Sequence, residues 1–489
     1  MPITSLDPIA ATTEPRSALS SKSSATIGRL RSAAGPAGTA LALLAVATGA
    51  LLFANHRGSA LKDAGLPTPS SRPTDKTLAS ASPAVLGATP RREFYVGGDL
   101  ARAASVEDLR AMAHRRLPRF ALEYLEGGSE DEATLARNIE ALAEWRFTHR
   151  SLVDVSRRDL SSNLFGRRMA MPLAVAPTGL NALFWPHADL RLAEAAADAG
   201  IPFVQSTMSN DAMAAVASVP RLRHWWQLYV FGPSAVWEAL IERARDRGCE
   251  ALVVTVDAQL YGNREWEKRD RADAKSLSWS AKFDALRHPR WLMSGIASHG
   301  MPRFDNVVEF VPKDRRGFFD SAHWIRSQMD RGLSWDTVAR IRDQWPGKLV
   351  IKGLLNTGDV VRAAEIGADA VALSNHGGRQ LDWAVSPLDI LQSAREAVGG
   401  RIAILVDGGM RRGTDVIKAI ALGADAVLIG RTALYGVAAA GREGVKRSLD
   451  ILRDEIDRDL GLLGAPSMAA LGPQLLVRSG QSSAVVRAS

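Results

Sequence analysis

Three stretches of the chain are variants of one pattern: "GCEALVVTVD" (248–257), "GADAVALSN" (367–375) and "GADAVLIGR" (423–431). Each has a glycine, then a short apolar run, then a polar or charged residue. Continuously apolar runs that lack polar alternation are typical of strands buried on both faces of a parallel sheet. The repeat therefore predicts buried strands that alternate with helices.

Five further runs of the same kind complete a set of eight predicted strands. The eight are Leu173–Ala176, Pro202–Ser206, His224–Val230, Ala251–Asp257, Lys348–Lys352, Ala370–Ser374, Ile402–Asp407 and Ala426–Gly430. Helical patterns such as 189–199 and 234–247 lie between most of them. Eight such units predict an α/β fold, the closed (β/α)8 TIM barrel. The alternative, an open doubly wound sheet, favours a GxGxxG motif after the first strand, where this chain has "PTGLN" (177–181).

The first 90 residues differ from the rest, being rich in Ser, Ala, Thr and Pro. Their apolar block, 37–54, would form a helix about 27 Å long, close to the thickness of a bilayer core. We expect a transmembrane or signal segment here, then a linker, then the barrel domain over 91–489. A disordered extension or a misassigned start codon is the alternative. We predict association with the inner or cytoplasmic membrane. Because basic residues flank both sides of the block, we make no prediction of the side of the membrane on which the barrel lies.

An insertion at about 259–333 separates the fourth and fifth predicted strands. Its part 264–331 is basic and rich in Trp and Phe. This composition suits a membrane interface. A lid whose aromatic side chains pack on the barrel is an equal alternative.

Composition excludes several classes of protein. The single cysteine, Cys249, rules out a disulfide framework, and the nine histidines show no metal-binding spacing, so we predict no metal. The net charge is +8, and about half of the excess lies in the first 90 residues. No nucleic-acid-binding motif accompanies this charge, so we predict no nucleic-acid partner.

The chain places polar residues or glycines at the end of almost every predicted strand, where TIM barrels carry their catalytic groups. They are Pro177, Thr178, Gly179, Ser206, Gln227, Tyr229, Thr255, Asp257, Lys352, Ser374, His376, Arg379, Asp407, Gly408, Gly409, Arg411, Gly430 and Arg431. A lone Gln or Thr could be structural. The presence of such residues at the ends of eight strands instead predicts that they form one site.

The residue types in this set suggest a phosphorylated planar cofactor. Gly-rich backbone with Arg411 and Arg431 follows the last two strands, where such barrels bind phosphate. Lys352 would place positive charge near a ring that gains electrons. In "SNHGGRQLD" (374–382), His376 suits proton transfer near neutral pH, and the next arginine suits a carboxylate. Asp257 could orient the imidazole.

At these residues the chain resembles the FMN-dependent L-2-hydroxy acid dehydrogenase and oxidase family. The resemblance covers about 106–464 and rests on "SNHGGRQLD", "DGGMRRGTD" (407–415) and the Gly-Arg pair at 430–431, in that order. It implies FMN as cofactor. FMN contacts would come from Pro177, Thr178, Gly179, Ser206, Gln227, Thr255, Lys352 and Ser374, and phosphate contacts from Asp407, Gly408, Gly409, Arg411, Gly430 and Arg431.

The resemblance also implies roles toward a small 2-hydroxy acid of the L-lactate or (S)-mandelate type. His376 would be the base and Asp257 its support. Tyr124, Arg264 and Arg379 would bind the carboxylate. Tyr229 would hydrogen-bond the substrate oxygen, and Met208 would face the substrate side chain. The loop "VDAQLYGNREWEKRD" (256–270) departs from the family pattern but retains the arginine.

Two segments, "PTGLNALFWP" (177–186) and "HPRWLMSGIASHGMPRFDNV" (288–307), resemble the membrane-associated mandelate and lactate dehydrogenase branch. This implies electron transfer to quinone or another membrane acceptor, and the family suggests a possible homotetramer. The alternatives are an oxidase that reduces oxygen to hydrogen peroxide and a catalytically inactive FMN-binding sensor or scaffold. The presence of His376 and Arg379 disfavours the inactive protein.

Overall fold

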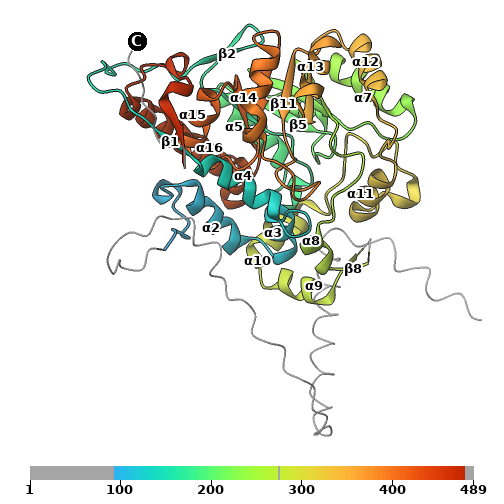
Figure 1. Cartoon of the computed structure of the whole chain (residues 1–489). Helices are drawn as coiled ribbons and strands as arrows, with labels where there is room; N and C mark the ends of the chain where they lie inside the picture. Colours follow the sequence, from blue (N-terminus) through green and yellow to red (C-terminus); the bar gives the residue numbers. More distant parts are fainter. Residues whose placement is uncertain (1–92, 274–275, 480–489) are drawn as a thin grey trace, which may run out of the picture. The chain divides into compact units, whose positions relative to one another are not determined.

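The computed structural model describes residues 93–273 and 276–479 (Figure 1). The apolar block expected at 37–54 and the linker after it lie outside these residues. Within the described ranges, no helix has both the length and the apolar character that crossing a bilayer requires.

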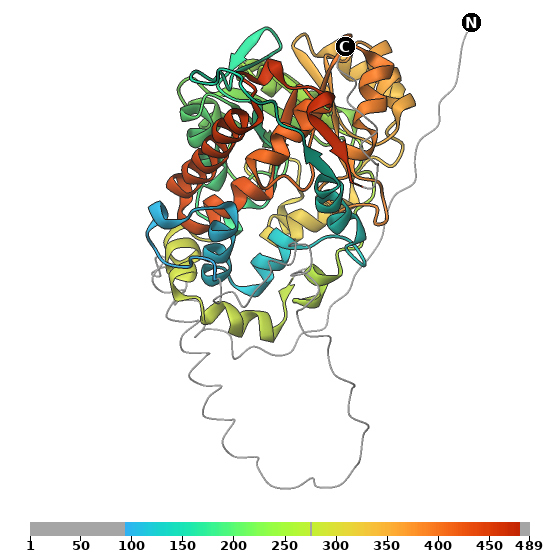
Figure 2. The ribbon, with the colours of Figure 1, turned by 60° about the vertical axis from the view of Figure 1, so that its left-hand side comes forward.

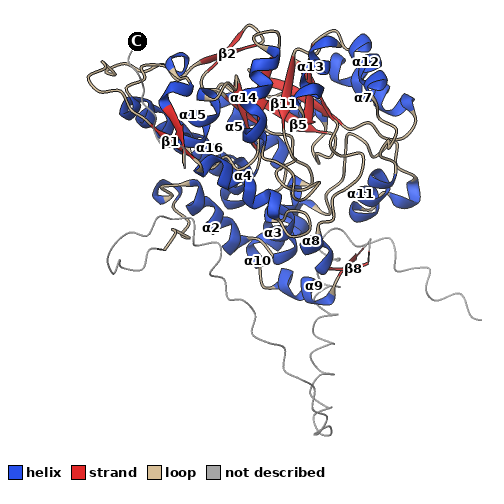
Figure 3. Cartoon of the chain, viewed as in Figure 1, coloured by secondary structure: helices blue, strands red, loops and turns tan. Residues whose placement is uncertain are grey.

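Eight parallel strands form a closed barrel. Its strands are drawn in red around the labels β5 and β11 in the upper part of Figure 3. In chain order they are β4 (Leu173–Val175), β5 (Pro202–Ser206), β6 (Arg223–Leu228), β7 (Ala251–Thr255), β10 (Lys348–Leu354), β11 (Ala370–Leu373), β12 (Ala403–Val406) and β13 (Ala426–Ile429). Pairing of β13 with β4 and of β7 with β10 closes the ring. The predicted TIM barrel is confirmed, and the open-sheet alternative is wrong.

The barrel interior is filled by alternate residues of the strands. Small side chains such as Ala251 and Ala372 pack against large ones such as Trp225 and Leu405. The antiparallel pair β2 (Ser162–Leu164) and β3 (Arg167–Met169) adds Leu164 and Met169 to this cluster and closes the end of the barrel at which the strands begin. The other end, where the strands finish, remains available for a site.

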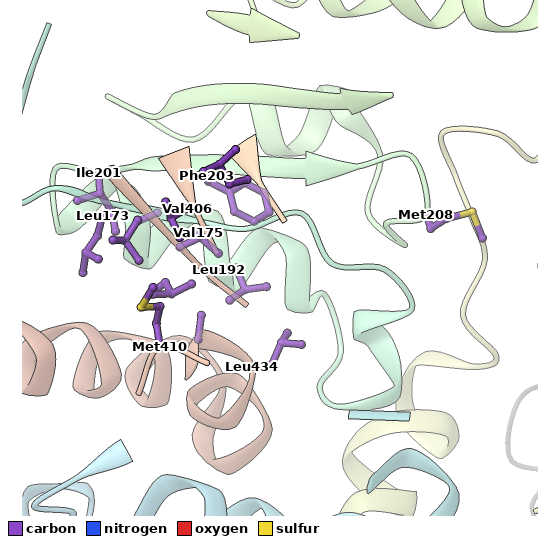
Figure 4. Packing of buried hydrophobic residues seen from close by; sticks show 14 of the residues in the cluster. Leu173, Val175, Leu192, Ile201, Phe203, Met208, Val406, Met410 and Leu434 are labelled. Carbon is purple, nitrogen blue, oxygen red and sulfur yellow. The ribbon is translucent and has the colours of Figure 1, made fainter. Parts of the chain in front are cut away.

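Helices cover the outside of the barrel and bury their apolar stripes against the outward faces of the strands. They are α5 (Ala188–Asp198), α6 (Met213–Ala217), α7 (Ser234–Asp246), α12 (Trp335–Gln344), α13 (Thr357–Glu365), α14 (Pro387–Val398), α15 (Gly413–Ala421) and α16 (Arg431–Leu463). Figure 4 shows one part of this layer, where Leu192 of α5 lies near Val175 and Phe203. The helix α16 bends at Ala440 and Gly441, which depart from helical geometry.

Segments outside the repeating units cover the end of the barrel that carries the site. Before the barrel come α2 (Val106–Arg116), α3 (Arg119–Glu126) and α4 (Ala133–Ala143). The insertion forms α8 (Glu265–Arg269), β8 (Arg271–Asp273), β9 (Ser276–Leu277), α9 (Trp279–Leu286), α10 (Pro289–Leu292), the π-helix η3 (Met293–Ala297), η4 (Lys313–Arg315) and α11 (Phe318–Ser327). In Figure 2 its yellow-green part, which contacts α3 through α8 and α9, runs along the lower edge of the folded chain.

The first and last strands of the described chain pair with each other. β1 (Trp145–Phe147) runs antiparallel to β14 (Leu476–Arg478), and Trp145 lies opposite Arg478. Arg478 also donates to Glu144 Oε2 at 2.6 Å. The segment after α16 is thereby fastened to the segment that follows α4.

Candidate active site

A cavity of about 1130 Å³, partly open to solvent, lies at the C-terminal ends of the barrel strands. Its lining contains most of the site residues expected from the sequence, namely Tyr124, Pro177, Thr178, Gly179, Ser206, Met208, Tyr229, Thr255, Arg264, Lys352, His376, Arg379, Asp407, Gly408, Gly409, Arg411, Gly430 and Arg431. The other three lie directly behind the lining. Gln227 accepts from Ser206 Oγ at 3.0 Å, Asp257 pairs with His376, and Ser374 accepts from Lys352 Nζ at 2.7 Å.

Lys352 places a fixed positive charge at the cavity. Its ammonium is buried and lies 2.9 Å from Asp407 Oδ2, besides its bond to Ser374. Burial alone would lower the pKa of Lys352, but Asp407 and Asp257 outweigh it, so the net pKa is raised. The lysine therefore stays protonated at neutral pH and can stabilise negative charge on a ligand beside it.

Several buried polar atoms at the cavity have no partner among the described residues. They are Thr178 Oγ1, Gln227 Nε2, Thr255 Oγ1 and Asp407 Oδ1. An unsatisfied buried polar group costs about 1–3 kcal/mol. Their positions around one cavity, with Lys352 among them, fit a flat ligand that carries donors and acceptors along its edge, such as the isoalloxazine ring of FMN.

The loop after β12 and the start of α16 can hold a phosphate. Gly408 and Gly409 have positive φ values of 93° and 79°, and a Cβ at Gly409 would lie 2.5 Å from the carbonyl oxygen of Asn138. Gly430 immediately precedes the first turn of α16, whose free N–H groups favour anions. Arg411 contributes a guanidinium to the same part of the lining.

Arg431 is used differently from the expectation of a freely available phosphate ligand. Its guanidinium donates to the backbone carbonyls of Leu125, Gly377 and Gly127 at 2.8–3.0 Å. Burial lowers its pKa to about 9, and the charge of Arg379 contributes to the shift. The residue lines the cavity while it ties α3 to the loop that carries His376.

His376 stands on the loop after β11 with its imidazole fixed at both ends. Nδ1 lies 3.0 Å from Asp257 Oδ1, and Nε2 lies 3.4 Å from the Tyr229 hydroxyl. In this arrangement the Nδ1–H group donates a hydrogen bond to Asp257, which leaves the Nε2 lone pair directed at the cavity. Burial lowers the pKa of His376, with Asp257 opposing this effect. Burial would raise the pKa of Asp257, but His376 and Lys352 reverse this and the net pKa is lowered.

The turn of this loop requires its glycines. Gly377 and Gly378 have φ values of 66° and 76°, and a Cβ at Gly378 would lie 2.7 Å from the backbone of Leu135. The carbonyl of Gly378 also accepts from the backbone N–H of Ser129 at 2.9 Å. The close approach to α4 thereby holds His376 and Arg379 on the same side of the loop.

Two arginines line the cavity beside His376. Arg379 Nη1 donates to the carbonyls of Tyr124 and Gly127 at 2.8 Å, and its Cζ lies 4.8 Å from the centre of the Tyr124 ring. Arg264 donates to the carbonyl of Arg379 at 3.2 Å. A buried guanidinium, that of Arg264, and a largely buried one, that of Arg379, next to a base form a site suited to a small carboxylate.

Comparison with known proteins gives the family of this site. Residues 113–478 match the family model described as FMN-dependent dehydrogenase. The chain belongs to that family. FMN, the cofactor expected from the sequence, is confirmed as the cofactor of this FMN-dependent dehydrogenase, and the resemblance inferred from its motifs is confirmed.

Named relatives of the FMN-dependent dehydrogenase share most of its length. (S)-mandelate dehydrogenase of Pseudomonas putida is 43% identical over 378 residues, which cover 77% of this chain and 94% of the relative. L-lactate dehydrogenase of Caulobacter vibrioides is 38% identical over 374 residues, 76% of this chain and 97% of the relative.

Solved structures agree with this assignment. The crystal structure of the monotopic membrane protein (S)-mandelate dehydrogenase has a TM-score of 0.74 at 42% identity, and the match covers 77% of this chain and all of that chain. A mandelate oxidase structure has a TM-score of 0.65 at 35% identity and covers 76% of this chain and 98% of that one.

Sequence reasoning missed two charged residues of the dehydrogenase site. Glu267 is buried, accepts from Arg379 Nη2 at 2.8 Å and lies 3.6 Å from Arg264. Arg326 of α11 lines the cavity, 3.9 Å from Glu267 and 4.4 Å from the ring centre of Tyr261. Glu267 lies on α8, three residues after Arg264, which precedes the first residue of that helix, and this spacing could have predicted the pair. Nothing in the sequence connects Arg326 to the barrel.

Proposed function

We propose that this FMN-dependent dehydrogenase oxidises an L-2-hydroxy acid, of the L-lactate or (S)-mandelate type, to the 2-oxo acid. The observation that carries the proposal is the His376–Asp257 pair, which faces the same cavity as Arg264 and Arg379. A base beside two carboxylate-binding cations suits removal of protons from a carboxylate-bearing alcohol.

Each residue has a proposed part in this reaction. Arg264, Arg379 and the Tyr124 hydroxyl bind the substrate carboxylate, and Met208 packs against the substrate side chain. The Tyr229 hydroxyl, 3.4 Å from His376 Nε2, donates to the substrate oxygen while Nε2 accepts a proton. Asp257 stabilises the imidazolium that results. When bound, FMN supplies the two-electron acceptor.

The cofactor residues divide into two groups in this proposal. Pro177, Thr178, Gly179, Ser206, Gln227, Thr255, Lys352 and Ser374 hold the ring system. Asp407, Gly408, Gly409, Arg411, Gly430 and Arg431 hold the ribityl chain and the phosphate, with Arg431 acting through its backbone at the start of α16. Lys352 stabilises the negative charge that the ring acquires, because it remains protonated in its buried position.

Peripheral membrane association is proposed for the surface formed by α9, α10 and η3. Trp279, Phe283 and Met293 are 69%, 50% and 63% exposed, and exposed Arg287 and Arg290 lie in the same segment. Aromatic and basic side chains together suit the interfacial zone of a bilayer. We propose that electrons leave through this surface to a membrane acceptor such as quinone. A homotetramer is a further proposal, which light scattering of the purified protein would check.

The proposed reaction is tested by recording the flavin absorbance of the full-length holoenzyme without oxygen. We expect L-lactate or (S)-mandelate to bleach the flavin band, and the D-enantiomers to leave it unchanged. Admission of air then tests the acceptor, since slow recolouring indicates a dehydrogenase, whereas fast recolouring with peroxide indicates an oxidase. A flavin that no 2-hydroxy acid bleaches would contradict the proposed substrate class.

The rate of bleaching is expected to depend on pH through His376, which must be neutral to accept a proton. The rate should therefore rise with pH and reach a plateau. Since burial lowers the pKa of His376, half of the plateau rate is expected below the ordinary value of 6.5. Asp257→Asn removes the carboxylate that raises this pKa, so the rise should move to still lower pH. The plateau should also fall, because an amide does not fix the same tautomer.

A rise centred above pH 6.5 in the parent enzyme would contradict the assignment of His376 as a buried neutral base. The flavin spectrum of Asp257→Asn serves as the control, because retention of the cofactor separates a change in proton transfer from a loss of structure.

A further inference from the structure

A second cavity, of about 830 Å³ and partly open to solvent, lies beside the active site, between the loop after β4 and the insertion. Phe184 belongs to the linings of both cavities. Its side chain is fully buried, and its ring stacks on that of Tyr124 with centroids 6.1 Å apart. A single aromatic wall therefore separates the second cavity from the site at which the acid is oxidised.

The walls of the second cavity offer flat apolar faces. Trp185 and Trp291 both line it, together with Ile296 of η3. The Trp291 indole is held by its hydrogen bond to the carbonyl of Leu183 at 2.7 Å, and the Arg116 guanidinium lies 4.3 Å from the ring centre of Trp185. Rigid aromatic walls of this kind favour a planar ring as the ligand.

The same cavity contains groups that can carry protons. The imidazoles of His187 and His299 lie 5.5 Å apart in an edge-to-face arrangement. His187 Nδ1 lies 2.7 Å from Asp211 Oδ1. Behind the lining, the buried carboxylate of Asp189 accepts from the backbone N–H groups of Asn210 and Asp211. Burial, with the charge of Asp211, raises the pKa of Asp189 to about 7. A ligand that gains protons when it is reduced would find donors here.

The exposed rim of the cavity carries one large apolar side chain, Met301, and two charged ones, Arg303 and Asp305. Met301 lines the cavity and is 52% exposed. It follows the α9–η3 surface proposed above to meet the membrane. The cavity therefore opens next to the segment proposed to meet the membrane, from which a ligand dissolved in lipid could reach it.

We propose that the second cavity binds a quinone, which accepts the electrons released by acid oxidation. The proposal rests on the proposed function and adds the place where the acceptor binds. Two electrons pass from reduced FMN to the quinone, whose two oxygens each gain a proton and become hydroxyl groups. Bound FMN in its reduced form would give up the two electrons and one proton, and the second proton is the one that the oxidised acid released. His187 and His299 pass protons to the quinone oxygens.

Gly295→Phe in the full-length holoenzyme tests the site. Gly295 lines the second cavity but not the first, and a Cβ there meets no atom within 4 Å, so the ring can occupy the cavity without disturbing η3. Ser298→Phe is the matched control, because Ser298 is exposed in the same segment and does not line the cavity. Binding of a short-chain ubiquinone analogue is measured by equilibrium dialysis. Reoxidation is measured after photoreduction without oxygen, so that no acid is needed.

We expect the analogue to bind the parent and Ser298→Phe saturably, and Gly295→Phe at least tenfold more weakly. The reduced Gly295→Phe enzyme should react with the analogue at least tenfold more slowly, yet react with ferricyanide at the parent rate. His187→Asn removes the imidazole and should show the same selective loss. Asparagine is the replacement because it tolerates the left-handed backbone at this position (φ 53°).

Equal binding and equal reoxidation by the analogue in Gly295→Phe and Ser298→Phe would overturn the proposal. So would an equal slowing of the reaction with ferricyanide, because that would place the effect at the flavin. Photoreduction replaces the acid in these measurements. A failure of the proposed substrate class would therefore show as unbleached flavin, while the test of the quinone site would still be decisive.

Discussion

His376→Asn is expected to slow the bleaching of bound flavin by the acid about 10³-fold, within the 10²–10⁴-fold range that a positioned general base contributes. The variant loses the Nε2 lone pair that faces the cavity and the Nδ1 contact to Asp257. Asparagine is the suitable replacement because His376 has a φ of 59°, a conformation that asparagine adopts more readily than most residues. Stopped-flow absorbance under anaerobic conditions measures the rate.

His323→Asn provides the matched control for this variant, since His323 is exposed on α11. Both variants should retain a yellow flavin spectrum. Bleaching of His376→Asn within tenfold of the parent rate, with the flavin retained, would remove His376 from the role of base.

Arg379→Met is expected to lower kcat/KM at least about 100-fold, since hydrogen bonds to charged groups contribute about 1.5–3 kcal/mol each and an arginine can offer a carboxylate two of them. The fold should survive, because Glu267 keeps Arg264 and Arg326 as neighbours, at 3.6 and 3.9 Å. The affinity for the 2-oxo acid product, titrated through the flavin spectrum, should fall in parallel. This parallel loss distinguishes carboxylate binding from a structural role.

Arg269→Met removes one positive charge from the same helix as Glu267 but at an exposed position, where Arg269 pairs with Glu265 at 2.8 Å. We expect its kcat/KM to stay within twofold of the parent. Unchanged product affinity in Arg379→Met would contradict the proposed carboxylate site.

The strands of the barrel could be predicted from the sequence because each is a short, continuously apolar run after a glycine turn. Their C-terminal ends were predicted too long at several places. The expected run 224–230 ends at Leu228, and 251–257 ends at Thr255. Tyr229 and Asp257 therefore stand on loops just beyond the ladder, where a side chain is free to turn toward the cavity.

The position of a residue at the C-terminal end of a strand predicted that it lies near the cavity, but not whether its side chain lines the cavity or lies behind the lining. Gln227, Asp257 and Ser374 stand behind the lining because they bond to Ser206, His376 and Lys352 respectively. Arg326 could not be predicted from the sequence for another reason. It comes from α11 of the insertion, and its approach to Glu267 depends on how that long connection packs, which no local periodicity specifies.

The pairing of β1 with β14 bears on how the chain acquires its fold during synthesis. Glu144 and Arg478 are 334 positions apart, so their contact waits until nearly all of the described chain has left the ribosome. Contacts of such high sequence separation are slow to form because a long loop must close first. The eight βα units can condense before this, as they appear in order. We expect β1 and β14 to pair last. A chain shortened before Leu476 would therefore form the barrel, but the segment that follows α4 would lack its pairing with β14.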